Sequence, residues 1–319
     1  MEQFKKLNNL IGGGIFLIAS LVYLLTIEQT VSFWDCGEYI ATAYKLEVGH
    51  PPGAPLFQLI GRIFSLFAAA GTSEVAVSIN ILSALCSSFT ILFLFWTITA
   101  FGLKLWDKLD GTKTYLILSS GVIGALAYTF SDSFWFSAVE GEVYAMSSFF
   151  TAITFWCILK WEQEFDSPHA NRWLVLIAYL IGLSIGVHLL SLLTIPAMGM
   201  IYYYKKYEAT KSGSIKAFII SMLILGSVQG VIIPGAVSLI SSFELFFTNS
   251  IGLPFNTGTI IYFLSLIGLI VFGLYYTKKI NKPLWNTAIL SVLVLLIGYS
   301  SFAILVVRSN ANPPIDENN

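Results

Sequence analysis

The chain has 319 residues, of which 56% are hydrophobic, 15% aromatic and only 11% charged, and its mean hydropathy is +0.78. Soluble domains carry about a quarter charged residues, so the composition excludes an ordinary soluble protein and predicts an all-α, polytopic membrane protein. The net charge of −1 says little about partners, and no nucleic-acid partner is predicted.

Apolar runs that approach the roughly 20 residues of a bilayer crossing recur along the chain. In order they cover 9–27, 75–103, 114–131, 142–160, 173–187, 189–204, 217–240, 259–277 and 284–307, which predicts about nine transmembrane helices. The first run has a basic flank and no small-residue cleavage site, so a retained helix is expected rather than a signal peptide. The two runs beside His188 are short, which favours helices that stop partway at a cavity.

The run 54–70 is apolar but carries Arg62 near its middle. If it does not cross the bilayer, 14 of the 17 basic residues fall on the cytoplasmic side, as the positive-inside rule requires. These are Lys5, Lys6, Lys104, Lys108, Lys113, Lys160, Arg172, Lys205, Lys206, Lys211, Lys216, Lys278, Lys279 and Lys282. We therefore expect the N-terminus to be cytoplasmic and the loop 28–74 to be external, with surface helices at about 35–48 and 54–70.

In this topology the external side holds most of the acidic residues and three basic ones. The external acids are Glu28, Asp35, Glu38, Glu47, Glu74, Asp132, Glu140, Glu142, Glu244, Asp316 and Glu317, and the external bases are Lys45, Arg62 and Arg308. This asymmetry predicts that polar chemistry takes place on the external face.

The stretch FWDCGEYIATAYKLEVGHPPGAP, residues 33–55, is the most polar part of that face. In a helix, Asp35, Glu38, Thr42 and Lys45 would share one side, either as a working site or as a merely solvated surface. Two prolines, Pro51 and Pro52, then prevent the helix from continuing. The resulting turn is expected to hold His50 near Asp35, although a structural role for this histidine is the alternative.

Two further segments carry candidate residues. In SAVEGEVYAMSSFF, Ser137 and Glu140 match the S-x-x-E pattern of a helix capping box, which is the structural alternative for Glu140. Glu142 is predicted one turn into an apolar helix, where an ionisable group usually faces a cavity. His188, in GVHLLSLL, and Arg308, at the end of the last span, have structural alternatives in a helix break and in contacts with lipid headgroups.

The strings FWDCGEYIATAYKLEVGHPPGAPLFQLIGRIFSLF, SAVEGEVYAMSSFF and GVHLLSLL resemble a bacterial membrane family of formerly unknown function that is similar to protein O-mannosyltransferases. The resemblance implies an integral-membrane glycosyltransferase with a GT-C fold in the bacterial inner membrane. It implies a polyprenyl-phosphate sugar donor, a secreted protein or glycan as acceptor, and an active site on the external face. Members of this family continue beyond the ninth span, so 1–308 is expected to be the transmembrane domain and 309–319 a tail that leads to a further C-terminal region.

The resemblance also implies roles for single residues. Asp35 is the expected catalytic base of an inverting transfer, with Glu38 as the second carboxylate. From their charge and their predicted external position, more than from any motif, four side chains are expected to bind the donor phosphate: Lys45, His50, Arg62 and Arg308. The substrate cavity is expected to be lined by Glu140, Glu142, Tyr144 and His188.

Other readings of the sequence stay open at this point. No metal-ligand spacing is visible and no cofactor is assigned, although Asp35 and Glu38 could share a divalent ion. The alternative functions are a membrane transporter or a flippase for lipid-linked glycans, and a structural subunit whose external loop docks a partner. Transporters usually carry ionisable residues near the middle of the membrane, whereas these acids are predicted at one surface.

Overall fold

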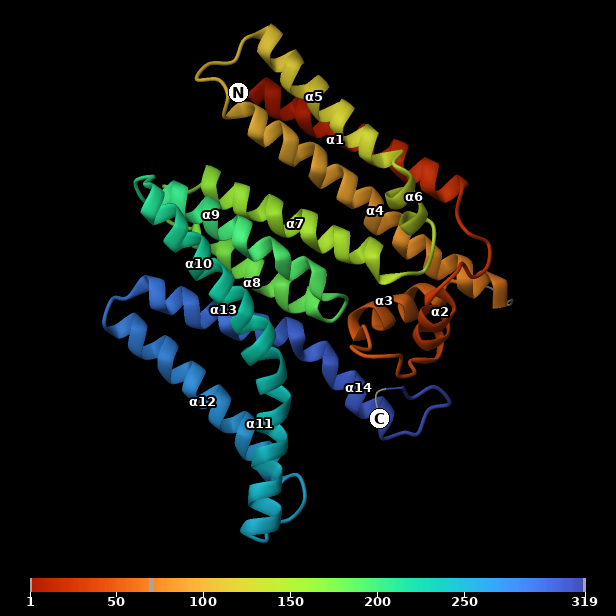
Figure 1. Ribbon diagram of the computed structural model, residues 1–319, viewed down its shortest axis with the longest axis vertical. Helices are drawn as coiled ribbons and strands as arrows, with labels where there is room; N and C mark the ends of the chain where they lie inside the picture. The colour runs from red at the N-terminus through yellow and green to blue at the C-terminus, as the bar shows by residue number, and fades with distance from the viewer. Residues whose placement is uncertain (1, 69–71, 318–319) are drawn as a thin grey trace. The chain divides into compact units, whose positions relative to one another are not determined.

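The computed structural model describes residues 2–68 and 72–317, and every named element in this part of the chain is a helix. The helices of Figure 1 are α1 (Glu2–Leu25), α2 (Cys36–Lys45), α3 (Pro55–Ser65), α4 (Thr72–Leu103), α5 (Gly111–Thr129), α6 (Asp132–Ala138), α7 (Val143–Gln163), α8 (Asn171–Ile185), α9 (Thr194–Lys206), α10 (Lys211–Ser227), α11 (Ile233–Leu245), α12 (Thr257–Lys279), α13 (Pro283–Tyr299) and α14 (Ala303–Ser309). The prediction of an all-α protein is confirmed. Residues 69–70 of the predicted second surface helix and 318–319 of the predicted tail lie outside the described residues.

The chain folds as two compact units. The first contains Met1–Lys160, Leu180–Leu192 and Ile297–Asn319, and the second contains Trp161–Tyr179 and Leu193–Leu296. All ten residues that the sequence singles out for catalysis, donor binding or the substrate cavity belong to the first unit.

Six helical stretches of the described chain are long and apolar enough to cross a membrane, and a bent pair would make a seventh. The six are Glu2–Leu25, Glu74–Leu103, Val143–Gln163, Lys211–Ser250, Thr257–Lys279 and Pro283–Ser309, and the pair α5 and α6 is bent by 69°. These helices make the chain an integral membrane protein. The predicted runs 173–187 and 189–204 become α8 and η1 (Leu189–Leu193) with α9. With 15 residues, α8 is about 22 Å long, short of a ~30 Å hydrocarbon core, so the count of nine stays a prediction.

The core of the first unit lies where α1, α4 and α5 pack together. Buried residues from all three helices form one apolar cluster that includes Ile15, Phe95 and Ala125. Tyr23 is fully buried in it, and its hydroxyl donates to the carbonyl oxygen of Thr129 at 3.0 Å. This bond satisfies the one polar atom of the ring, as burial requires.

Two short helices, α2 and α3, form a hairpin in the loop between α1 and α4. They occupy less of the chain than the predicted helices 35–48 and 54–70, because α2 ends at Lys45 with Leu46 in the left-handed region (φ 51°). The buried rings of Tyr39 and Phe57 pack against each other between the two helices, with their centroids 5.5 Å apart. A Cβ at Gly61 would stand 2.9 Å from the Cβ of Ala43, so the close approach of the two helices depends on this glycine.

The second unit is built largely from long apolar helices. An ordered cap joins α11 to α12: the carboxylate of Glu244 accepts hydrogen bonds from the backbone N–H groups of Asn256 (2.6 Å) and Thr259 (2.8 Å). Asn256 is the N-cap residue of α12 and Thr259 lies in its first turn, where the N–H groups lack partners within the helix. Glu244, one of the predicted external acids, therefore has a structural role.

Candidate functional site

The centre of the candidate site is an ion pair between Glu38 and His50. The Nδ1 atom of His50 lies 2.9 Å from Oε2 and 3.0 Å from Oε1 of Glu38, and the backbone N–H of His50 donates to Oε1 at 2.6 Å. The carboxylate of Glu38 raises the pKa of His50 above its ordinary value, and the charges of Asp35 and Glu317 act in the same direction. The imidazole is thus held in place and favoured in its protonated form.

The turn after α2 brings these two side chains together. Glu38 lies in the first turn of α2, and the chain then reverses through the segment Glu47–Gly53, in which the N–H of Gly53 donates to the carbonyl oxygen of His50 at 2.7 Å. His50 also packs against Tyr39, with 5.6 Å between ring centroids. The sequence predicted His50 near Asp35, but the direct partner is Glu38.

The predicted polar side of α2 is not uniformly solvated. Asp35, at the N-cap position, is exposed, and Glu38 is half-buried. Thr42 is fully buried, and its hydroxyl is satisfied by donating back to the carbonyl oxygen of Glu38 at 2.8 Å. Glu38 therefore lies at the boundary between the interior and solvent, with Asp35 on the open side.

Two buried carboxyl groups, Glu140 and Glu142, lie next to this pair. They are 5% and 4% exposed, and both precede α7, which begins at Val143. Burial, followed by the charges of Glu140 and Asp35, raises the pKa of Glu142 to about 7. Burial also raises the pKa of Glu140, and within the described residues its Oε2 atom has no hydrogen-bond partner.

The capping-box alternative for Glu140 is wrong. Ser137 lies inside α6 rather than at the start of a helix, and α7 begins three residues after Glu140. The short break between α6 and α7 is what buries Glu140 and Glu142 beside α2.

Tyr39 was not predicted as a site residue, yet it lies among these charged groups. Burial raises the pKa of its phenol, and the neighbouring charges of Glu142, Asp35 and Glu38 add to the effect. The phenol therefore keeps its proton and can donate a hydrogen bond. The only signal in the sequence is its place one residue after Glu38, which does not distinguish a site residue from a core residue.

An aromatic pair borders the same region. The rings of Tyr144 and His188 lie 5.5 Å apart, and Nδ1 of His188 accepts a hydrogen bond from the N–H of Leu190 at 3.1 Å. Burial lowers the pKa of His188. The imidazole is thus favoured as the neutral tautomer with its proton on Nε2, an uncharged ring beside a half-exposed tyrosine.

The three remaining cations lie at the other end of α2, about 15 Å along its axis from Asp35. Arg62 donates from Nη1 to the carbonyl oxygen of Tyr44 at 2.6 Å, and its guanidinium lies 5.2 Å from the centre of the Tyr44 ring. Arg308 donates from Nε to the carbonyl oxygen of Leu46 and from Nη2 to that of Lys45 at 3.4 Å. Lys45 itself is exposed. The sequence contains no signal for these backbone contacts, and a role of the three cations in phosphate binding stays a prediction.

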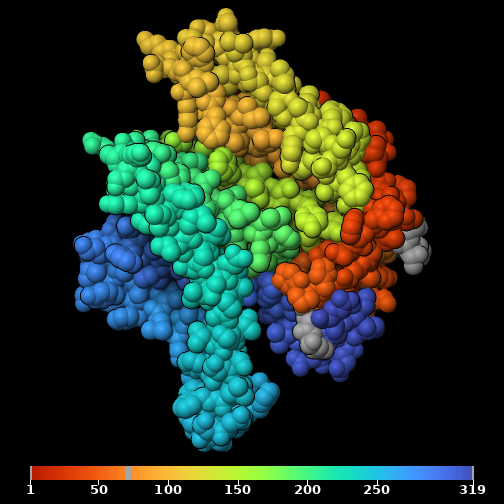
Figure 2. Space-filling model, viewed as in Figure 1, coloured from red at the N-terminus to blue at the C-terminus, as the bar shows by residue number. Residues whose placement is uncertain are grey.

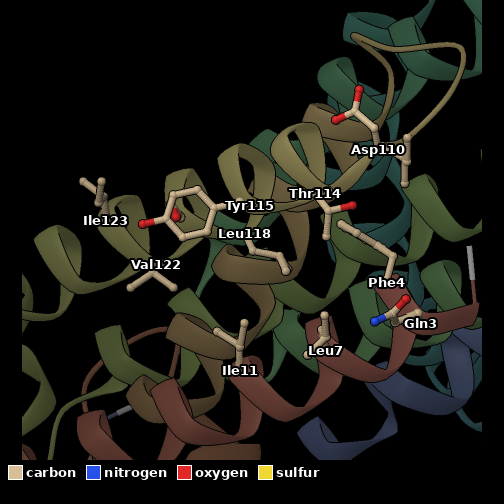
Figure 3. A pocket seen from close by; sticks show the side chains of 13 residues that line it. Gln3, Phe4, Leu7, Ile11, Asp110, Thr114, Tyr115, Leu118, Val122 and Ile123 are labelled. Carbon is tan, nitrogen blue, oxygen red and sulfur yellow. The ribbon is translucent and has the colours of Figure 1, made fainter.

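The site and a cavity of the same unit lie at opposite ends of α1 and α5. The cavity, of about 860 Å³, is lined mainly by apolar side chains, among them Phe4, Leu7, Ile11 and Leu118. Figure 3 shows these side chains projecting between the two helices, with Asp110 at one end.

No group of three or more His, Cys, Asp or Glu residues is placed to hold a metal ion in the described ranges. A divalent ion shared by Asp35 and Glu38 stays a prediction.

Comparison with known proteins assigns the family. Residues 35–211, more than half of the chain, match the model of the Protein O-mannosyl-transferase TMEM260 N-terminal domain. The chain is 31% identical over 139 residues to protein O-mannosyl-transferase tmem260 of Dictyostelium discoideum, which covers 44% of this chain and 15% of that protein. It is 26% identical over 171 residues to protein O-mannosyl-transferase TMEM260 of Mus musculus, which covers 54% of this chain and 22% of that protein.

No solved structure matches the chain. The aligned parts span less than a quarter of the curated relatives' own lengths. The matched segment begins at Asp35 and contains the Glu38–His50 pair, both buried acids and the Tyr144–His188 rings. The predicted resemblance to protein O-mannosyltransferases is confirmed, and the chain belongs to the family of the TMEM260 N-terminal domain.

Proposed function

We propose that this chain is the membrane domain of a GT-C-type glycosyltransferase that moves a mannose-like sugar from a polyprenyl-phosphate donor to a hydroxyl group of a secreted protein or glycan. The observation that carries the proposal is the convergence of Asp35, the Glu38–His50 pair and Glu142 inside the matched segment. In this proposal the α2–α3 loop faces the external side of a bacterial inner membrane, and the N-terminus is cytoplasmic.

Asp35 is the proposed general base, because it is the exposed carboxylate of the cluster and a macromolecular acceptor must approach from solvent. It removes the proton of the acceptor hydroxyl while the oxygen forms a bond to the anomeric carbon. The bond from that carbon to the phosphate oxygen breaks, and the electron pair leaves with the lipid phosphate. The configuration at the anomeric carbon is inverted.

His50 is the proposed partner of the leaving phosphate. A preorganised cation stabilises the negative charge that develops as the bond breaks, and Glu38 keeps the imidazole both oriented and protonated. The remaining N–H groups of Arg62, together with exposed Lys45, supply further positive charge. A guanidinium has five N–H donors, so the backbone contact of Arg62 with Tyr44 does not exhaust them.

The buried groups around this centre suit a sugar. A carboxyl group with a pKa of about 7, as Glu142 has, and the phenol of Tyr39 can donate hydrogen bonds to hydroxyl oxygens. The Oε2 atom of Glu140, which has no hydrogen-bond partner in the described part of the chain, can accept one from a sugar hydroxyl. The rings of Tyr144 and His188 provide a flat face against which a pyranose ring can pack.

The test is a transfer assay with the purified full-length protein, a polyprenyl-phosphate mannose donor and an acceptor peptide. We expect transfer to the peptide, and a loss of about 10²- to 10⁴-fold in kcat for Asp35→Asn, the usual effect of removing a general base. Asp110→Asn, the same change at the other end of α5, is the matched control and should retain full activity.

Full activity of Asp35→Asn would refute the assignment of the base. Movement of intact lipid-linked sugar across vesicles, without transfer to any acceptor, would instead support a flippase.

A further inference from the structure

The backbone that follows α2 is bound by side chains from two distant parts of the chain. The carbonyl oxygens at the end of a helix lack partners within it, and at α2 these are occupied by arginines. Arg62 of α3 reaches Tyr44, whereas Arg308 of α14 reaches Lys45 and Leu46. Positive side chains at this end of a helix are also favoured by the helix dipole.

The C-terminal segment binds Val48, two residues further along the same backbone. The N–H of Val48 donates to the carbonyl oxygen of Ile315, and the N–H of Glu317 donates to that of Val48, both at 3.0 Å. These two bonds form an isolated parallel bridge between Val48 and Asp316. Figure 2 shows the blue C-terminal residues lying against the orange α2–α3 hairpin.

The C-terminal segment is itself folded back on the end of α14. The hydroxyl of Ser309 lies 3.2 Å and 3.3 Å from the two carboxylate oxygens of Asp316. Arg308, which binds the end of α2, is the neighbour of Ser309 in α14. One short piece of chain, from Arg308 to Glu317, therefore binds both Leu46 and Val48.

The segment bound in this way leads directly to His50. Leu46 has left-handed backbone angles (φ 51°, ψ 56°), which an L-residue adopts only at a cost in free energy, so the surroundings must hold it. Only Gly49 separates Val48 from His50, whose N–H and Nδ1 both contact Glu38. A displacement of Leu46 or Val48 would move the imidazole away from that carboxylate.

We propose that Arg308 is a positioning residue for the site, and that Arg308 with Ile315–Glu317 forms a strap that holds His50 on Glu38. Glu317 acts in a second way, because its charge also favours the protonated imidazole. The catalytic consequence rests on the proposed function, whereas the structural claim does not.

The experiment combines hydrogen exchange with titration of His50 by NMR, in the full-length protein in nanodiscs. In Arg308→Gln we expect the amides of Val48 and His50 to exchange about tenfold faster and the pKa of His50 to fall, because the imidazole leaves both Glu38 and Glu317. We expect kcat to fall at least about tenfold, with the KM for the donor unchanged. Arg308→Lys should restore part of each effect, since an ammonium group supplies donors without the planar fork.

Two further variants separate the causes. Glu317→Gln keeps the backbone bridge and removes the charge, so the pKa of His50 should fall while amide exchange stays unchanged. Arg172→Gln removes an arginine that pairs with Glu164 at 2.8 Å in the second unit, and it should change none of these quantities.

Unchanged exchange and an unchanged His50 titration in Arg308→Gln would overturn the proposal. A rise in the donor KM with both unchanged would overturn it too, and would make Arg308 a phosphate ligand instead. If the full-length protein transfers no sugar, the proposed function fails, but exchange and titration still decide whether the strap positions His50.

Discussion

The two ends of α1 and α5 differ: one end has a large apolar cavity, and the other has the Glu38–His50 pair and the buried carboxyl groups. At one end a cavity of about 860 Å³ is lined mainly by apolar side chains. The acidic residue in this lining, Asp110, has a structural role at the start of α5. Asp110 accepts a hydrogen bond from the N–H of Lys113 at 2.9 Å at the start of α5, and it lies 3.3 Å from Nζ of the same lysine.

At the other end the carboxyl groups of Glu47, Glu140 and Glu142 are buried, and a fourth carboxylate, that of Glu38, binds His50. Burying a carboxyl group is costly unless it is paired or neutralised, and this end of the unit contains three buried carboxyl groups. Pocket size is the usual guide to a ligand site. Between the spans of a membrane protein it is a poor guide, because lipid chains can occupy apolar crevices, and the perturbed carboxyl groups locate the site better.

The largest effect expected from this contrast is that of Glu38→Gln. The amide keeps the size of the side chain and removes its charge, so the pKa of His50 should fall and sugar transfer should drop about 10- to 100-fold at pH 7.5. Because Glu38 raises the pKa of His50 in the native protein, the protonated imidazole persists to higher pH there than in the variant. The variant should therefore regain activity as the pH is lowered, and the pH dependence of kcat measures this shift.

The control for this change is Glu2→Gln, which removes a carboxylate at the cavity end that lies 3.0 Å from Nζ of Lys6. It should leave the pH profile as it is. If kcat of Glu38→Gln depends on pH in the same way as kcat of the native protein, the role of the ion pair is contradicted.

A smaller effect is expected from Gly49→Ala. A Cβ at this position would stand 2.6 Å from Oε1 of Glu38, so the carboxylate must shift and its contacts with His50 must lengthen. We expect a loss of transfer of several-fold, about 3- to 10-fold, and a lower Tm. The rate of sugar transfer and the thermal unfolding of the protein are the measurements.

Gly37→Ala is the matched control, because nothing lies within 4 Å of a Cβ there and the residue is helical. It should leave transfer unchanged and stabilise the protein by about 0.5 kcal/mol, as alanine does in helices. Equal effects of the two substitutions would show that the Glu38–His50 geometry does not limit the reaction.

The smallest effect is expected at the cavity end, from Asp110→Ala. It removes the acceptor for the N–H of Lys113, so the start of α5 loses its cap. We expect a fall in Tm smaller than that of Gly49→Ala and no change in transfer. A loss of transfer comparable to that of Glu38→Gln would mean that the cavity, and not the α2–α3 loop, is the reaction site.

The sequence by itself determined the helical class, most of the span positions and the family. Apolar runs must become helices in a bilayer, since every backbone N–H and C=O has to be satisfied within the segment. The predicted spans therefore correspond to helices even where, as at α8 and α9, the helices are short. The loop between α1 and α4 was recognised as a candidate site because Asp35, Glu38 and His50 stand close together in an otherwise apolar chain.

Only the tertiary structure decided which of these groups meet. The pairing of His50 with Glu38 rather than Asp35 depends on the turn after α2, and the burial of Thr42 depends on its packing inside the hairpin. The contact between Arg308 and Leu46 joins residues 262 positions apart. Periodicity shows which side chains share one face of a helix, but it contains no information on what lies against that face, because distant packing is set by the whole fold.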